Sequence, residues 1–121
     1  MATILIVEDD NNQRLLYREE LEDEGYRVVE AKDGREALAF IEKSPPDAVV
    51  LDISMPGTDG LETLGRIHDL NREIPVVLNT AYAAYKDQFV SWIADAYVVK
   101  SSNLDELKQA LRRALAKREN V

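Results

Sequence analysis

The stretch ILIVEDD, residues 4–10, sets the fold class of this chain of 121 residues. Four consecutive branched apolar residues predict a strand that is buried on both faces, which is the habit of a parallel sheet. Three acidic residues follow at once. The same order returns in AVVLD, residues 48–52, and further apolar runs occupy residues 76–78 and 96–99. Residues 26–30 predict a more polar strand at an edge of the sheet.

Segments with helical periodicity alternate with these strands. The predicted helices cover residues 11–24, 33–43, 59–70, 83–93 and 103–115. Gly25 suits the left-handed stop after the first of them, and Asn103 with Glu106 predicts a capping box at the start of the last. Five strand–helix units predict one α/β domain over residues 1–121, with an open, doubly wound parallel sheet, flavodoxin-like, in the strand order 2-1-3-4-5.

Composition narrows the function classes. The net charge is −8, from 23 acidic and 15 basic residues, so direct binding to nucleic acid or anionic lipid is not expected. The absence of cysteine excludes disulfides and thiolate metal sites. The apolar runs are strand-sized, which predicts no membrane insertion. The first residues show no secretory signal, and we therefore expect a cytoplasmic location.

Acidic residues follow two strands that flank the point where the predicted strand order reverses. Ligands bind at this point in open parallel sheets. Glu8 and Asp9 follow the first strand, and Asp52 follows the third. Close carboxylates repel one another unless a cation neutralises them, and Mg²⁺ prefers oxygen ligands. Because no histidine or cysteine falls in this group, we predict a magnesium site rather than zinc or copper; a solvated acidic loop is the simpler alternative.

The ends of the last two predicted strands add a hydroxyl and a cation. Thr80 follows the fourth strand and Lys100 follows the fifth. Phosphoryl transfer needs this combination, because its catalysis consists mostly of positioning and charge neutralisation. A carboxylate can be the nucleophile and form an acyl phosphate. Asp52, which stands alone after its strand, is the candidate.

These motifs, in this order, resemble the response-regulator receiver domains of two-component signalling, which are CheY-like. The resemblance covers essentially the whole chain and rests on residues 4–10, 50–60, 79–81 and 97–100. It implies that Asp52 accepts the phosphoryl group. It also implies that Asp9 binds Mg²⁺ directly, that Glu8 acts through water, and that the backbone carbonyl of Ser54 is a further ligand.

The resemblance assigns roles to residues around the phosphoryl group as well. Thr80 would donate its hydroxyl to a phosphoryl oxygen, and Lys100 would pair with another. Tyr97 would be the aromatic switch residue whose ring turns inward when the Thr80 hydroxyl is drawn to the phosphate. Ser54 and Tyr82 would border the path of the attacking water and tune the lifetime of the phosphorylated state.

Partners are implied only as classes. A sensor histidine kinase or a phosphotransfer protein would supply the phosphoryl group. The surface formed by residues 83–93, 96–99 and 103–115 would carry the output to a downstream protein or output domain whose identity is unknown, and a phosphorylation-dependent dimer is left open. The domain would be no enzyme towards other molecules, since it would catalyse only its own phosphorylation and slow autodephosphorylation.

Departures from the family pattern keep alternatives open. Ser101 stands where family members usually have a proline that follows a cis bond. A cis bond without proline costs about 2.5–4 kcal/mol, so we predict a trans Lys100–Ser101 bond. The main alternative function is a pseudo-receiver, an interaction module that is never phosphorylated. A phosphatase with an aspartyl nucleophile after its first strand and an FMN-binding domain fit the motif positions less well.

Overall fold

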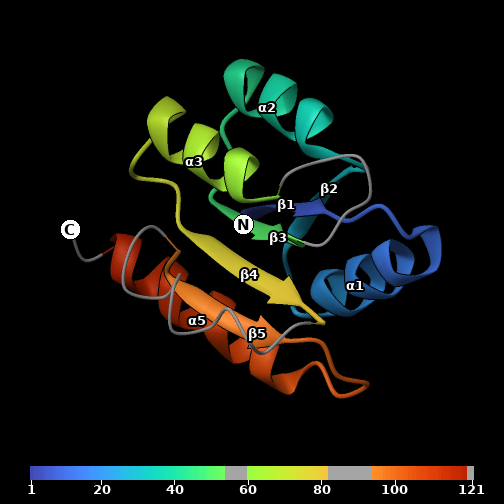
Figure 1. Ribbon diagram of the computed structural model, residues 1–121. Coiled ribbons are helices and arrows are strands. Elements are labelled where there is room, and N and C mark those ends of the chain that lie inside the picture. The colour runs from blue at the N-terminus through green and yellow to red at the C-terminus, as the bar shows by residue number, and fades with distance from the viewer. Residues whose placement is uncertain (54–59, 82–93, 120–121) are drawn as a thin grey trace.

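The computed structural model of the protein describes residues 1–53, 60–81 and 94–119, which form a five-stranded parallel sheet with helices on both faces (Figure 1). The strands are β1 (Thr3–Val7), β2 (Arg27–Ala31), β3 (Ala48–Leu51), β4 (Val76–Thr80) and β5 (Ala96–Val99). Their order in the sheet is β2-β1-β3-β4-β5. The predicted fold class, the strand order and the edge position of the second strand are confirmed. The apolar run of residues 76–78 lies in β4, which continues to Thr80.

Four helices cover the sheet in the described part of the chain. They are α1 (Asn11–Asp23), α2 (Gly34–Lys43), α3 (Gly60–Leu70) and α5 (Asp105–Glu119). α1 and α5 lie on one face, and α2 and α3 lie on the other (Figure 1). The helix predicted over residues 83–93 lies outside the described residues.

Side-chain alternation divides the core between the two faces. Towards α1 and α5, the strands contribute one buried set: Ile4, Ile6, Val28, Ala48, Val50, Val77 and Val98. Towards α2 and α3, they contribute the other: Leu5, Val7, Ala31, Val49, Leu51, Val76, Leu78 and Tyr97. This parity decides which face each residue at a strand end presents.

Local capping explains where the helices begin and end. The Asp10 Oδ1 accepts a hydrogen bond of 3.0 Å from the Gln13 N–H and caps α1. The Asn103 Oδ1 accepts one of 2.8 Å from the Asp105 N–H, so Asn103 caps the last helix as predicted. The Asn103 N–H donates to the Ser101 Oγ at 3.1 Å instead of to Glu106, so the second half of the predicted capping box is replaced. Gly25 has φ +93°, which is the left-handed conformation predicted after the first helix.

The apolar residues of α1 do not all face the sheet. Tyr17 and Leu21 are buried, whereas Leu15 and Leu16 are 52% and 43% exposed. Residues four apart share one face of a helix, and residues 15 and 16 point away from the face of residues 17 and 21. The helix therefore shows two adjacent leucines on the surface of the protein.

The structure also tests two further predictions. The described residues contain no cis peptide bond, so the Lys100–Ser101 bond is trans as predicted. Across the described ranges, every helix is too short or too polar to cross a membrane.

Candidate functional site

Two buried carboxylates form the floor of the candidate site at the carboxyl ends of β1 and β3. Glu8 is 2% exposed and Asp52 is 4% exposed. The Glu8 N–H donates to the Ala31 carbonyl at 3.0 Å, and the Asp52 N–H donates to the Val7 carbonyl at 3.1 Å. The sheet hydrogen bonds thus continue one residue past each strand. Both carboxylates are held by the backbone of the sheet rather than by a free loop.

Asp9 completes a group of three carboxylates. It is exposed, and one carboxylate oxygen from each of Glu8, Asp9 and Asp52 lies within 4.8 Å of the other two. This spacing lets a single hard cation contact all three groups, directly or through water. The predicted convergence of these residues is confirmed, and their oxygen chemistry fits Mg²⁺.

Lys100 reaches both buried carboxylates. Its Nζ donates to the Glu8 Oε1 at 2.7 Å and to the Asp52 Oδ2 at 2.8 Å. The backbone N–H of Lys100 donates to the Thr80 carbonyl at 2.7 Å, which extends the pairing of β4 and β5 past the end of β5. Proximity of Lys100 to Asp52 was predicted from the sequence, whereas its contact with Glu8 was not.

Charge and burial act against each other in this site. Burial raises the pKa of the Glu8 carboxyl, and the charge of Asp52 adds to the rise while Lys100 opposes it. For Lys100, burial lowers the pKa, but the hydrogen bonds to Asp52 and Glu8 outweigh it and the pKa is raised. The ammonium therefore stays charged at neutral pH, and two carboxylates share this one cation.

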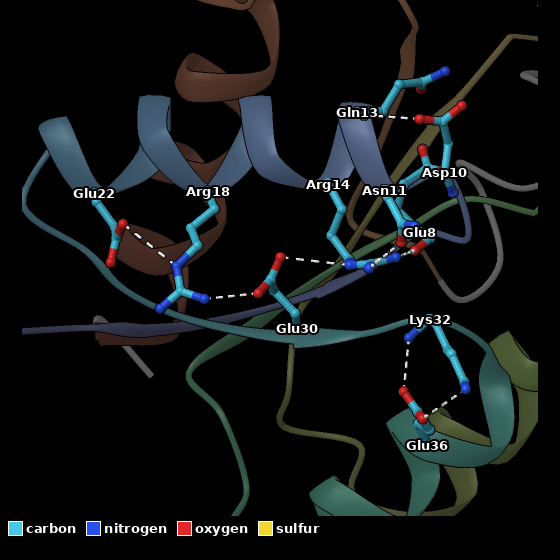
Figure 2. A network of polar contacts seen from close by, with 10 residues as sticks. All are labelled: Glu8, Asp10, Asn11, Gln13, Arg14, Arg18, Glu22, Glu30, Lys32 and Glu36. Atoms are coloured by element: carbon cyan, nitrogen blue, oxygen red, sulfur yellow. Dashed lines mark hydrogen bonds and ion pairs between the residues drawn. The ribbon is translucent and has the colours of Figure 1, made fainter.

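Asp10 and Arg14 support the acidic loop without joining the carboxylate group. Asp10 caps α1, and its N–H donates to the Glu8 Oε2 at 3.3 Å. The Arg14 Nη1 donates to the Glu8 carbonyl at 2.7 Å, and its Nε pairs with Glu30 of β2 at 3.4 Å (Figure 2). The bracing by Arg14 was missed, because the sequence pattern shows which helix an arginine lies on but not which carbonyl it meets.

Thr80 and Tyr97 lie on the opposite face of the sheet from Asn79 and Val98. Thr80 is fully buried, and Tyr97 is 4% exposed and packs in the core under α2 and α3. In the register of β4 and β5, Tyr97 pairs with Leu78, two residues before Thr80. The two predicted switch residues are therefore diagonal neighbours on one face, with the ring of Tyr97 buried.

Ser54 and Tyr82, with the carbonyl ligand and lifetime roles predicted for them, lie outside the described residues.

A buried polar pair beside the site was also missed. Asn79 of β4 is 3% exposed, and its side chain lies beside the hydroxyl of Tyr17 in α1, whose pKa it lowers against the larger effect of burial. The Tyr17 hydroxyl in turn donates to the Gln13 Oε1 at 3.3 Å. Burial raises the pKa of Tyr17, so the phenol stays neutral. The sequence did indicate a buried polar residue here. Asn79 follows three buried apolar residues, and it lies two residues after Val77, on the same face of the sheet.

Comparison with known proteins identifies the family and several relatives of this chain. The sequence profile described as the response regulator receiver domain matches residues 4–112. The transcriptional regulatory protein TcrA of Mycobacterium tuberculosis is 40% identical over 95% of this chain and 46% of its own length. This chain therefore spans less than half of that relative. Sporulation initiation phosphotransferase F of Bacillus subtilis is 34% identical over 97% of this chain and 96% of its own length.

Solved structures agree with the sequence relatives. The response regulator protein TrrA of Thermotoga maritima, solved in complex with Mg²⁺-BeF, is 45% identical with a TM-score of 0.89, over 95% of this chain and all of TrrA. TrrA has also been solved in complex with the histidine kinase ThkA, where its TM-score to this chain is 0.87 over 95% of this chain and 99% of TrrA.

Proposed function

The chain belongs to the response regulator receiver domain family, and from this premise we propose that it accepts a phosphoryl group on Asp52 in a Mg²⁺-dependent reaction. One observation carries the proposal. Asp52 is a buried carboxylate that lies within reach of both a metal-binding group of acids and a lysine ammonium. Such a carboxylate can attack phosphorus because the charge that develops is already opposed by fixed groups.

The residues divide the work of the reaction. A carboxylate oxygen of Asp52 attacks the phosphorus atom, the bond from phosphorus to the donor atom breaks, and the donor leaves with that electron pair. Asp9, Asp52 and the carbonyl of Ser54 would hold the metal, with Glu8 acting through water. Bound Mg²⁺ would neutralise the transferring oxygens. Lys100 exchanges its contact with Glu8 for one with a phosphoryl oxygen.

The donor is a sensor histidine kinase or a phosphotransfer protein. The complex of TrrA with the kinase ThkA supports the first class, and the name of the Bacillus relative supports a relay of phosphoryl groups. The surface leucines Leu15 and Leu16 lie in the first turns of α1, directly after the acidic loop. A partner that covers the pocket would bury them, because apolar surface next to a site favours protein contact.

Output would pass through Thr80 and Tyr97. A phosphoryl group on Asp52 draws the Thr80 hydroxyl towards it and leaves room for the Tyr97 ring. The ring is buried in the structure described here, so phosphorylation would favour this position over an outward one. The surface around β5 and α5 then changes for a downstream protein, an attached output domain or a second copy of the chain. Beyond its own phosphorylation and slow autodephosphorylation, the domain would catalyse nothing.

The test uses a small phosphodonor with Mg²⁺, followed by mass spectrometry of the intact protein and its peptides. We expect one phosphoryl group on the wild type, located on Asp52, and none on Asp52→Asn. Omission of Mg²⁺ should abolish the labelling. Unlabelled wild-type protein would identify a pseudo-receiver, and a labelled Asp52→Asn protein would move the acceptor elsewhere.

A further inference from the structure

Asn79 stands between the two residues that the proposed reaction depends on most. β4 lies between β3 and β5 (Figure 1). Leu51 pairs with Leu78 across β3 and β4, so Asp52 and Asn79 are the next residues along each strand. Asn79 itself pairs with Val98 on β5, two residues before Lys100.

The same three residues share a face of the sheet. Val50, Val77 and Val98 all pack towards α1 and α5, and side chains two residues further along a strand return to the same face. Asp52, Asn79 and Lys100 are those residues. Tyr17 of α1 packs on this face, and the charges of Lys100 and Asp52 act on its pKa, which Lys100 lowers and Asp52 raises.

The side chain of Lys100 must therefore cross β4. Neighbouring strands lie about 4.8 Å apart, so β3 and β5 are separated by about twice that distance. The Lys100 Nζ nevertheless lies 2.8 Å from the Asp52 Oδ2. The lysine starts at the end of β5, so its methylene chain must cross β4. Asn79 is the β4 residue that lies on this face at the level of Asp52.

Tyr17 fixes the orientation of Asn79. The Tyr17 hydroxyl gives its hydrogen to Gln13, so its oxygen can accept a hydrogen bond from the Asn79 amide beside it. Both side chains are at least 96% buried, at 4% and 3% exposure. Burying an amide and a phenol costs free energy that an apolar pair would not, unless the two are hydrogen-bonded to each other. The neighbours of Asn79 on its face, Val77 and Val98, are apolar.

We propose that Tyr17 and Asn79 form a positioning pair, in which the Tyr17 hydroxyl holds the Asn79 carboxamide beneath the Lys100 side chain and so keeps the ammonium aimed at Asp52. The pair acts on the reaction only through Lys100, and its kinetic effect rests on the proposed function. Lys100 ends on Glu8 and Asp52, whereas the third member of the metal-binding group, Asp9, is exposed at the end of β1. The pair should therefore affect phosphoryl transfer more than Mg²⁺ binding.

Three variants test the pair. Tyr17→Phe removes only the hydroxyl, Asn79→Leu replaces the carboxamide with an apolar group of similar size, and the double variant removes both. Tyr26→Phe is the matched control, because it deletes a partly buried phenol whose charged neighbours are Arg112 and Glu24 rather than the pocket. Circular dichroism and thermal melting establish that each variant folds.

The measurement separates positioning from general stability. For each variant, the maximal rate constant of phosphorylation at saturating small phosphodonor, the half-saturating donor concentration and the Mg²⁺ affinity by calorimetry are compared. We expect the maximal rate constant to fall about tenfold in Tyr17→Phe and in Asn79→Leu, as for a misplaced reacting group. Donor half-saturation and Mg²⁺ affinity should change much less, and the double variant should be no slower than the slower single one.

Other results would overturn the positioning role. A wild-type rate in Tyr17→Phe would do so, as would an equal loss of rate in Tyr26→Phe. A loss of Mg²⁺ affinity in proportion to the rate would show that the variants merely loosen the pocket.

A second readout does not depend on phosphorylation. The NMR signal of the Lys100 ammonium group, assigned with Lys100→Met, is recorded without donor. We expect it to shift in Tyr17→Phe and Asn79→Leu but not in Tyr26→Phe. If the wild type takes no phosphoryl group, the proposed function fails, and this signal still decides whether the pair positions Lys100. An unshifted signal in both variants would refute the inference by itself.

Discussion

The two faces of the sheet carry different parts of the site at its carboxyl edge. Towards α1 and α5 lie the charged groups Asp52 and Lys100 with the polar side chain of Asn79. Towards α2 and α3 lie Thr80 and Tyr97, both neutral and both buried. Asn79 and Thr80 are adjacent in sequence, yet strand alternation sends them to opposite faces.

The difference between the faces separates two tasks. Charged groups in a buried place are costly to move, because each must stay close to an opposite charge throughout. A hydroxyl and an aromatic ring carry no net charge and exchange positions at lower cost. The face of Asp52 and Lys100 is therefore suited to fixed chemistry, and the face of Thr80 and Tyr97 is suited to a change of conformation.

The largest expected effect comes from removing the cation of the charged face. Lys100→Met leaves Glu8 and Asp52 buried without their shared partner, and we expect the free energy of unfolding to fall by about 3 kcal/mol without metal. Addition of Mg²⁺ should recover part of this loss, because the ion supplies positive charge to the same carboxylates. Urea denaturation with and without Mg²⁺ measures both quantities.

The pH dependence of the Lys100→Met variant sharpens this result. Without the lysine, the pKa of Glu8 rises further above its ordinary value of 4.5, so the folded state binds protons more readily than the unfolded state. Stability should then rise as the pH is lowered through the raised pKa towards the ordinary value. Lys32→Met is the control, since Lys32 pairs with Glu36 on the surface. An equal loss of unfolding free energy in Lys100→Met and Lys32→Met would mean that burial does not strengthen the contribution of Lys100 to stability.

A smaller effect is expected on the neutral face. Thr80→Ala should cost about 1 kcal/mol of stability, as for a lost hydrogen bond of a buried hydroxyl, and should leave Asp52 able to take a phosphoryl group. In this variant, the environment of the Tyr97 ring should no longer change when Asp52 carries a phosphoryl mimic. NMR of this ring with Mg²⁺ and a beryllium fluoride mimic measures that response. A ring that still responds in Thr80→Ala would break the assignment of the two residues to one switch.

The smallest effect is expected at the exposed member of the acidic group. Asp9→Ala removes repulsion towards Glu8 and Asp52 without uncovering a buried partner, so the melting temperature without metal should rise by about 2 °C. The stabilisation that Mg²⁺ gives the wild type should disappear. Thermal melts over a Mg²⁺ series test this, and an intact Mg²⁺ response in Asp9→Ala would place the metal elsewhere.

The sequence predicted the fold and the convergence of the site because both follow from strand order. Apolar runs located the strands, and the residues after each run were certain to meet at one edge of a parallel sheet. That logic brought Glu8, Asp9 and Asp52 together without any knowledge of side-chain positions, and it placed Thr80 and Lys100 at the same edge.

What the sequence could not predict depends on side-chain paths. Periodicity left Leu15, Leu16 and Tyr17 equally apolar, and only packing on the sheet buried Tyr17 and exposed the leucines. The contact of Lys100 with Glu8 bridges the two strands, β3 and β4, that lie between β1 and β5, and no spacing rule encodes such a contact. Asn79 was visible as a polar residue among apolar ones, but its partner came from a helix more than fifty positions away.

The bond between Lys100 and Glu8 also has a consequence for the order of events during synthesis. The two residues are 92 positions apart in the chain, and contacts of such long range close late in folding. A nascent chain that has completed β1 and β3 already carries its acidic residues but lacks the cation that neutralises them. The pocket is therefore finished only when β5 emerges from the ribosome and docks beside β4. A chain can therefore hold the complete pocket only after all five strands of the sheet have formed.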